Sequence, residues 1–176
     1  MEQNWYTTGE LDMEQNPYWL TNRVVNDDKR TRVIASLTAT LKVTDWLNLQ
    51  ARGTADYAHD TFQEKMYAST SPALAGANGR YIDFNYTETL YYGDAMAMAN
   101  KKWDDITFTA ALGGSINSRT VNSLRLDSKT ASLYYPNLFT VANIIMSTAA
   151  YTNQKINERR VIQSLFATAQ AGWKES

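Results

Sequence analysis

The side chains that most often carry catalysis are sparse in this chain of 176 residues. Its one histidine is His59 and it has no cysteine, which excludes mechanisms that need two imidazoles, a thiolate nucleophile or a typical zinc site. Two pairs of adjacent carboxylates, Asp27–Asp28 and Asp104–Asp105, lie in strand or turn patterns. Because neighbouring side chains there point to opposite sides, such a pair cannot share one substrate bond. We interpret both pairs as solvated turn residues.

The other motifs with chemical potential also favour structural roles. Gly113-Gly114 lacks the spacing and the following lysine of a phosphate-binding loop, and it falls inside an alternating pattern that favours a bend or close packing. With a single histidine, no serine–histidine–aspartate set is indicated. We therefore expect no enzyme activity, no metal site and no cofactor. A formal charge of −1 argues against nucleic acid as a partner.

The alternation of apolar and polar side chains predicts the strands that position these residues. At 33–43 the odd positions are apolar and most even positions are polar, and the pattern resumes at 47–57. Such strict alternation is typical of a strand with one apolar and one polar face. Similar segments lie at 106–116 and at 161–173, where Ile162 and Phe166 are exceptions.

The segment 90–100 alternates less cleanly, because Met96 and Met98 share a parity with Asp94. We place Asp94 on the polar face of this strand. The apolar face then consists of small residues: Gly93, Ala95, Ala97 and Ala99.

The connections alternate between short and long. Residues 44–46 and 101–105 form short turns, whereas we expect long loops at 58–89 and 117–160. Loops of this length are uncommon in compact soluble domains, whereas outer-membrane barrels combine short periplasmic turns with long extracellular loops. No stretch approaches the roughly 18 apolar residues of a membrane helix. The sequence therefore favours a transmembrane β-barrel over a helical membrane protein.

Aromatic residues mark the ends of the predicted strands. Trp46, Trp103 and Trp173 lie at short turns or at the chain end, and Tyr57 ends the second strand. Such rings settle at membrane interfaces, with their polar atoms toward water. Trp46 and Tyr57 are 11 residues apart. At about 3.3 Å per residue and a tilt near 45°, this span rises about 25 Å, the height of a barrel's apolar band. We predict that all four are membrane-interface aromatics.

Several short motifs occur in order along most of the chain. They are Asn16-Pro-Tyr-Trp-Leu-Thr-Asn-Arg23, Asp28-Lys-Arg30, Thr44-Asp-Trp-Leu-Asn-Leu-Gln50, Asn100-Lys101 with Trp103-Asp104 before Gly113-Gly114, Tyr135-Pro-Asn-Leu138, and Glu158-Arg-Arg-Val161 with Ser164. Together they resemble the SusC/RagA family of TonB-dependent outer-membrane transporters. The resemblance implies a barrel of about 22 strands filled by an N-terminal plug. It also implies nutrient uptake of glycans or peptides across the outer membrane, with TonB and a SusD-like surface lipoprotein as partners.

The chain departs from this family pattern, because we find no signal peptide, plug or TonB-binding segment and only about five strands. We therefore expect a fragment: an all-β, antiparallel transmembrane β-barrel segment that is an incomplete barrel. Its polar face would line the lumen, where Arg52 and Asp56 share one side of a strand and are predicted to contact the plug.

Aromatic residues in the predicted loops are candidates for contact with a substrate or a partner protein. They are Trp19, Tyr67, Tyr81, Tyr86, Tyr134 and Tyr135. The alternative is that these rings pack the loops against each other. A second hypothesis for the function is a soluble β-rich module that binds carbohydrate through the same rings.

Overall fold

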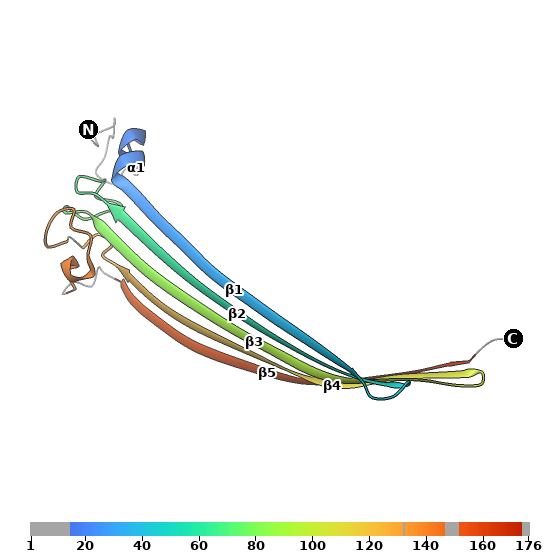
Figure 1. Ribbon diagram of the computed structural model, residues 1–176. Coiled ribbons are helices and arrows are strands. Elements are labelled where there is room, and N and C mark those ends of the chain that lie inside the picture. The colour runs from blue at the N-terminus through green and yellow to red at the C-terminus, as the bar shows by residue number, and fades with distance from the viewer. Residues whose placement is uncertain (1–14, 132, 147–151, 174–176) are drawn as a thin grey trace. The chain divides into compact units, whose positions relative to one another are not determined.

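The computed structural model describes residues 15–131, 133–146 and 152–173. Five long strands form one antiparallel sheet in which each strand pairs with its neighbours in sequence (Figure 1). The elements are α1 (Pro17–Arg23), β1 (Val24–Lys42), β2 (Leu47–Met66), β3 (Arg80–Trp103), β4 (Ile106–Asp127), the 3-10 helix η1 (Val141–Asn143) and β5 (Thr152–Trp173). The predicted all-β, five-stranded antiparallel fold is confirmed.

The contacts divide the chain into two units. The unit that we call the strand unit contains both short turns and comprises residues 32–58, 88–121 and the described part of 158–176. The unit that we call the loop unit contains α1, η1 and the long connections, within residues 1–31, 59–87 and 122–157. Each unit has its own packing.

The strands are longer than predicted, and the predicted loops 58–89 and 117–160 are wrong over much of their length. The segments 33–43, 47–57, 90–100, 106–116 and 161–173 all lie within strands, but β2 continues to Met66 and β3 begins at Arg80. The alternating sequence pattern indicates that one face of a strand is apolar, whereas the strand itself requires only backbone hydrogen bonds to its neighbours. Where both faces carry polar or mixed side chains, the strand continues although the sequence no longer alternates.

Cross-strand side-chain contacts fix the register of the strand unit. The hydroxyls of Ser36 and Thr54 lie 3.1 Å apart, and Arg52 Nε donates to both carboxylate oxygens of Asp94 at 3.1 and 3.0 Å. These residues share one face, so the even positions of β1, β2 and β3 form the polar face. The placement of Asp94 on that face is therefore confirmed.

Among the described residues of the strand unit, no second layer packs against the apolar side chains. Leu37 on β1 is 76% exposed and Leu165 on β5 is 91% exposed. Leu41, Leu112 and Ile116 are also exposed, so the described part of this unit has no continuous apolar core beneath its leucines. An exposed apolar surface of this extent is typical of a face that meets a partner or a membrane rather than water.

The loop unit, in contrast, buries a small apolar core. Tyr81, Leu126, Leu133 and Ile144 are buried together, with Phe139 and Val141 packed against them. This core joins the ends of β3 and β4 to the connection that follows β4.

Phe166 departs from the alternation of β5 because it covers a glycine on the neighbouring strand. A Cβ atom built on Gly113 would lie 2.5 Å from the Phe166 ring and 2.7 Å from the carbonyl oxygen of Ala95. Both distances are far inside van der Waals contact, so only glycine fits beneath this ring. Gly113 thus permits close packing between β3, β4 and β5.

We expect Gly113→Ala to destabilise the protein by about 1–3 kcal/mol, because the new methyl group must displace an aromatic ring or the backbone. Gly53→Ala is the matched control, since a Cβ at Gly53 meets no atom within 4 Å. Urea unfolding of both variants in the same detergent measures the difference. Equal unfolding midpoints for the two variants would contradict the packing of Phe166 on Gly113.

Candidate functional surfaces

The polar face of the strand unit carries arginine–carboxylate pairs between neighbouring strands. Arg32 on β1 binds Asp56 on β2 through two hydrogen bonds, of 3.0 Å from Nε and 2.6 Å from Nη2. Arg119 on β4 donates from Nε to Glu88 on β3. Together with Arg52–Asp94, these pairs leave a polar face that is rich in charged groups and locally neutral.

Arg52 and Asp56 lie on the polar face as predicted, but each is paired with a neighbouring strand. The side chain of Asp94 is fully buried, whereas that of Arg52 is about half exposed (0% and 47%). A buried carboxylate is stabilised only by its partner, so the guanidinium of Arg52 is held in place. The exposed part of this guanidinium can meet another molecule on the polar face. Contact of Arg52 and Asp56 with a plug stays a prediction.

The four aromatic residues predicted at the membrane interfaces are all exposed in the strand unit. Trp46 lies in the turn between β1 and β2, and Trp103 ends β3. Trp173 ends β5, and Tyr57 lies on β2. Each ring is therefore available to an external partner such as lipid.

Four of the six candidate aromatic residues of the loop unit pack within it. Trp19 is buried and its indole Nε1 donates to Thr70 Oγ1 at 3.0 Å. The ring of Tyr67 meets that of Phe139 edge to face, with centroids 5.1 Å apart. Tyr81 belongs to the buried core, and Tyr86 is half-buried. Their packing leaves Trp19 and Tyr81 little surface for contact with a ligand.

Tyr134 and Tyr135 differ, because their side chains are 59% and 68% exposed. Their backbone is nevertheless held by the buried Asn143. The side-chain amide of Asn143 donates to the carbonyls of Tyr135 and Leu138 at 2.8 and 2.7 Å and accepts from the Tyr135 N–H at 2.9 Å. A rigid backbone that presents exposed rings binds with a smaller loss of conformational entropy.

A second clamp acts on the same segment from the β2–β3 connection. Asn78 donates to the Leu133 carbonyl at 2.7 Å, and the N–H of Asn137 donates to the Asn78 carbonyl at 3.1 Å. Asn137 has φ 60° and accepts a hydrogen bond from the Ala68 N–H at 2.7 Å. We call the segment Leu133–Leu138 the tyrosine loop.

The asparagine clamps were not predicted from the sequence. Asn78 binds a backbone group that is far away in the sequence. Asn143 binds backbone groups that are near in the sequence, but at a spacing that is not characteristic of any turn or helix cap. Only Pro136-Asn137 carries a local signal, since a proline followed by asparagine is typical of a turn.

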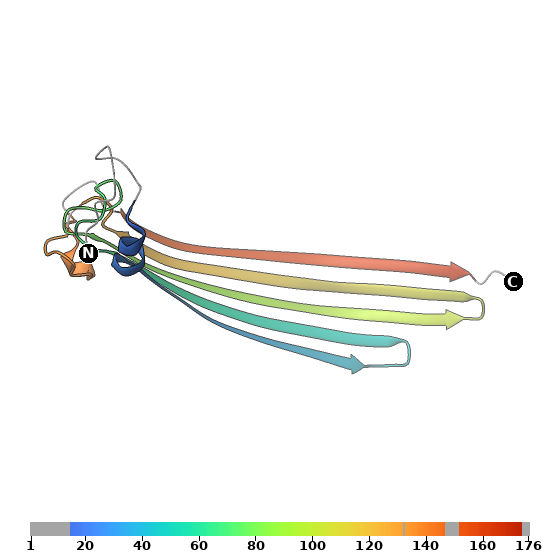
Figure 2. The ribbon, with the colours of Figure 1, turned by 90° about the horizontal axis from the view of Figure 1, so that it is seen from above.

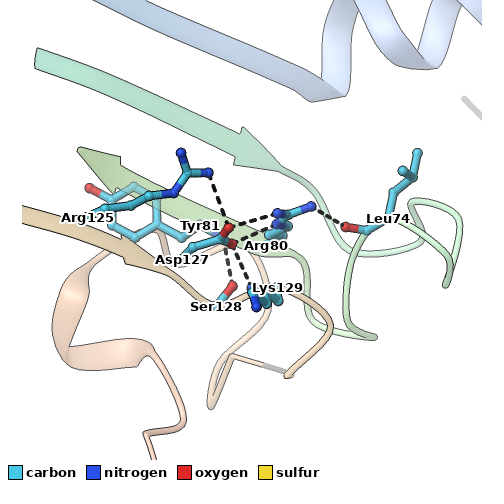
Figure 3. Close-up of polar contacts among 7 residues, drawn as sticks. All are labelled: Leu74, Arg80, Tyr81, Arg125, Asp127, Ser128 and Lys129. Carbon is cyan, nitrogen blue, oxygen red and sulfur yellow. Dashed lines mark hydrogen bonds and ion pairs between the residues drawn. The ribbon is translucent and has the colours of Figure 1, made fainter. Parts of the chain in front are cut away.

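A buried carboxylate holds the β3 and β4 ends of the loop unit together (Figure 3). Arg80 binds both oxygens of Asp127, at 2.8 Å from Nε and 2.9 Å from Nη2, and its Nη1 donates to the Leu74 carbonyl at 3.0 Å. The N–H of Lys129 donates to Asp127 at 2.8 Å. Asp127 therefore links both strands to the connections that follow and precede them.

The electrostatics of this cluster favour the charged form of Asp127. Burial by itself would raise the pKa of Asp127, but the hydrogen bonds from Arg80 and Lys129, with the charges of Arg80 and Arg125, hold it below its ordinary value. The pKa of Glu64 is raised, because burial outweighs the opposing charge of Arg80.

We expect Asp127→Asn to destabilise the loop unit by about 3 kcal/mol, because it leaves the Arg80 charge without its buried partner. Hydrogen exchange of the amides at 122–131 should then accelerate by roughly a hundredfold. Asp45→Asn is the control, because Asp45 is fully exposed in the strand unit.

The difference in exchange rate between the wild type and Asp127→Asn depends on pH. The pKa of Asp127 is lowered on folding, so its stabilisation is complete above the unfolded value of about 3.9 and is lost as the pH falls through the lower folded value. Exchange rates of the wild type and of Asp127→Asn should therefore converge in acid. A gap that stays constant down to pH 2 would contradict the role of the Asp127 charge.

Comparisons with known proteins found a similar structure but no match by sequence. No protein-family model matches the chain, and a search of curated proteins found no match. A chain in the solved structure of the RagAB peptide transporter superposes with a TM-score of 0.76 at 12% sequence identity. The alignment covers 98% of this chain and 19% of that chain. At this identity the likeness shows the fold alone, and it confirms the predicted fold of an antiparallel β-barrel segment.

No helix among the described residues is long and apolar enough to cross a membrane.

Proposed function

We propose that this chain is part of the barrel wall of an outer-membrane transporter. The observation that carries the proposal is the open apolar face of the strand unit, opposite a face of paired charges. A sheet with these two faces suits a wall between hydrocarbon and an aqueous or protein-filled lumen. The likeness to a chain of a peptide transporter, of which this chain spans about a fifth, supports the same function.

The finer proposal is a SusC/RagA-type, TonB-dependent receptor in the cell outer membrane. In it, the short turns that carry Trp46 and Trp103 lie on the periplasmic side, and long connections between strands lie on the extracellular side. Uptake of a peptide or glycan would involve a SusD-like lipoprotein, and Tyr134 and Tyr135 would contact this partner or the substrate. We propose binding and transport without catalysis.

The alternative, a soluble carbohydrate-binding module, requires that the apolar face be buried against a second layer. The exposure of Leu37 and Leu165 argues against it.

Leu37→Arg tests whether the apolar face meets hydrocarbon. Near the bilayer midplane, an arginine on this face should cost about 2–4 kcal/mol. The same charge on the polar face, in Thr40→Arg, should cost much less, since that side chain lies beside Gln50 in the register set by Ser36 and Thr54. The measurement is the fraction of the intact protein that folds into phospholipid vesicles over a urea series.

Equal folding of both variants would mean that the apolar face does not meet lipid. Cooperative, detergent-free folding of the wild type as a soluble monomer would favour the soluble module instead.

Tyr134→Ser with Tyr135→Ser tests the binding role of the tyrosine loop. Both side chains are exposed and the clamps act on the backbone, so unfolding should change by no more than about 0.5 kcal/mol. Affinity for the lipoprotein partner or for a labelled peptide should fall about tenfold or more, because exposed aromatic anchors carry much of the binding energy.

The matched control is Tyr81→Ser, which removes a buried ring of the same type. It should destabilise the loop unit. Unchanged affinity in the double variant, with a folded loop unit, would remove Tyr134 and Tyr135 from the proposed binding surface.

A further inference from the structure

The turn end of the strand unit holds a lysine between two tryptophan rings. Lys101 Nζ lies 5.5 Å from the ring centroid of Trp46 and 5.0 Å from that of Trp103. Both distances are within the range of cation–π attraction. The two rings come from neighbouring hairpins, whose short turns are visible in Figure 2. A hydrogen bond of 2.8 Å from the Asn100 N–H to the Trp46 carbonyl joins these hairpins.

The ammonium of Lys101 has no carboxylate partner among the residues that the structure describes. Of the carboxylates in the two short turns, Asp45 is bound to Lys42 at 2.7 Å, and neither Asp104 nor Asp105 forms an ion pair with Lys101 in the described part of the chain. An aromatic ring attracts the charge of an ammonium but accepts none of its three N–H bonds in the way that an oxygen does. Lys101 therefore keeps donors and positive charge for an external anion.

The position of Lys101 defines where that anion would lie. Lys101 has the same parity as Ala97 and Ala99, so it belongs to the apolar face at its turn end, where Trp103, Ile106 and Trp173 are exposed. A lysine at the edge of an apolar band lays its methylenes along that band and reaches with its charge into the polar zone. At a membrane surface this zone contains the phosphate groups of the lipids.

We propose that Lys101, Trp46 and Trp103 form a binding site for the phosphate group of a phospholipid. The ammonium pairs with the phosphate oxygens, and the two indoles flank the glycerol and the first methylenes of the acyl chains. Trp46 and Trp103 also hold the lysine side chain in place before the lipid arrives, which lowers the entropy cost of binding. This site rests on the proposed function, because it requires the apolar face to lie in a bilayer.

Lys102 supplies a matched control within the same strand. It follows Lys101 directly, it is exposed, and its side chain points to the opposite face. Lys101→Gln and Lys102→Gln therefore remove the same charge at the same level of the sheet, and only the first removes it from the site.

The experiment titrates phosphatidylglycerol into the intact protein, purified in a non-ionic detergent and phosphate-free buffer, and counts bound lipid by native mass spectrometry. Lys101→Gln should weaken the binding of the tightest lipid about five- to tenfold, and Lys102→Gln should leave it unchanged. Trp103→Leu should weaken it as well, whereas Trp173→Leu, which removes an indole outside the site, should not. Equal losses in the two lysine variants, or no loss in either, would overturn the proposal.

Two further measurements complete the experiment. The first distinguishes a lipid phosphate from a free phosphate ion, and the second distinguishes failure of this site from failure of the proposed function. Addition of 10 mM inorganic phosphate should not displace the lipid, and displacement would identify a site for the free anion, against the proposal. Insertion of each variant into vesicles is measured in parallel. Failure of the wild type to insert would refute the proposed function, whereas normal insertion of all variants with unchanged lipid binding in Lys101→Gln would refute this site alone.

Discussion

The strand unit depends on one constraint: each strand must keep its apolar side chains on one face of the sheet and its polar side chains on the other. Side chains alternate across the sheet, so a register shift of one residue on any strand would carry its leucines to the polar face. The pairs Arg52–Asp94 and Arg32–Asp56 oppose such a shift, because each holds one strand against the next. The buried carboxylate of Asp94 makes this restraint strong, since a slip would leave its charge without a partner. Electrostatics on one face thus preserve the apolar character of the other.

The loop unit achieves order by different means. It has little apolar area to bury, and it relies on side chains that satisfy backbone groups: Asp127 accepts from Lys129, and Asn143 binds the backbone on both sides of the Pro136–Asn137 turn. Asp127 and Asn143 are both buried, so water competes poorly for their hydrogen bonds. The result is a fixed backbone at Tyr134 and Tyr135, which a ligand that contacts their exposed rings does not have to order. For Tyr134 and Tyr135 this combination supports the proposed binding role, whereas Trp19, Tyr67 and Tyr81 pack within the loop unit.

The sequence predicted the strand unit better than the loop unit, and the reason is physical. Alternation is a local signal with a period of two, so it revealed the five strands, their faces and the position of Asp94. It failed at the strand ends, where β2 runs on to Met66 without an apolar face. Contacts without a regular spacing leave no such signal: nothing near Asn143 indicates that it binds Tyr135 and Leu138, and nothing near Phe166 indicates that it covers Gly113. For the loop aromatics, composition alone could not separate the buried Trp19 and Tyr81 from the exposed Tyr134 and Tyr135.

The unpaired edges of the sheet also bear on the proposed function. Among the described residues, β1 and β5 each pair with one neighbour and leave a row of backbone N–H and C=O groups along the other side. In hydrocarbon, each unsatisfied group costs several kcal/mol, so a membrane-facing sheet is stable only where both edges meet further strands. A soluble sheet could leave its edges to water but not its leucines. Under the proposed function, the open apolar face and the open edges therefore make the same demand: both edges of the sheet must pair with further strands of a barrel wall.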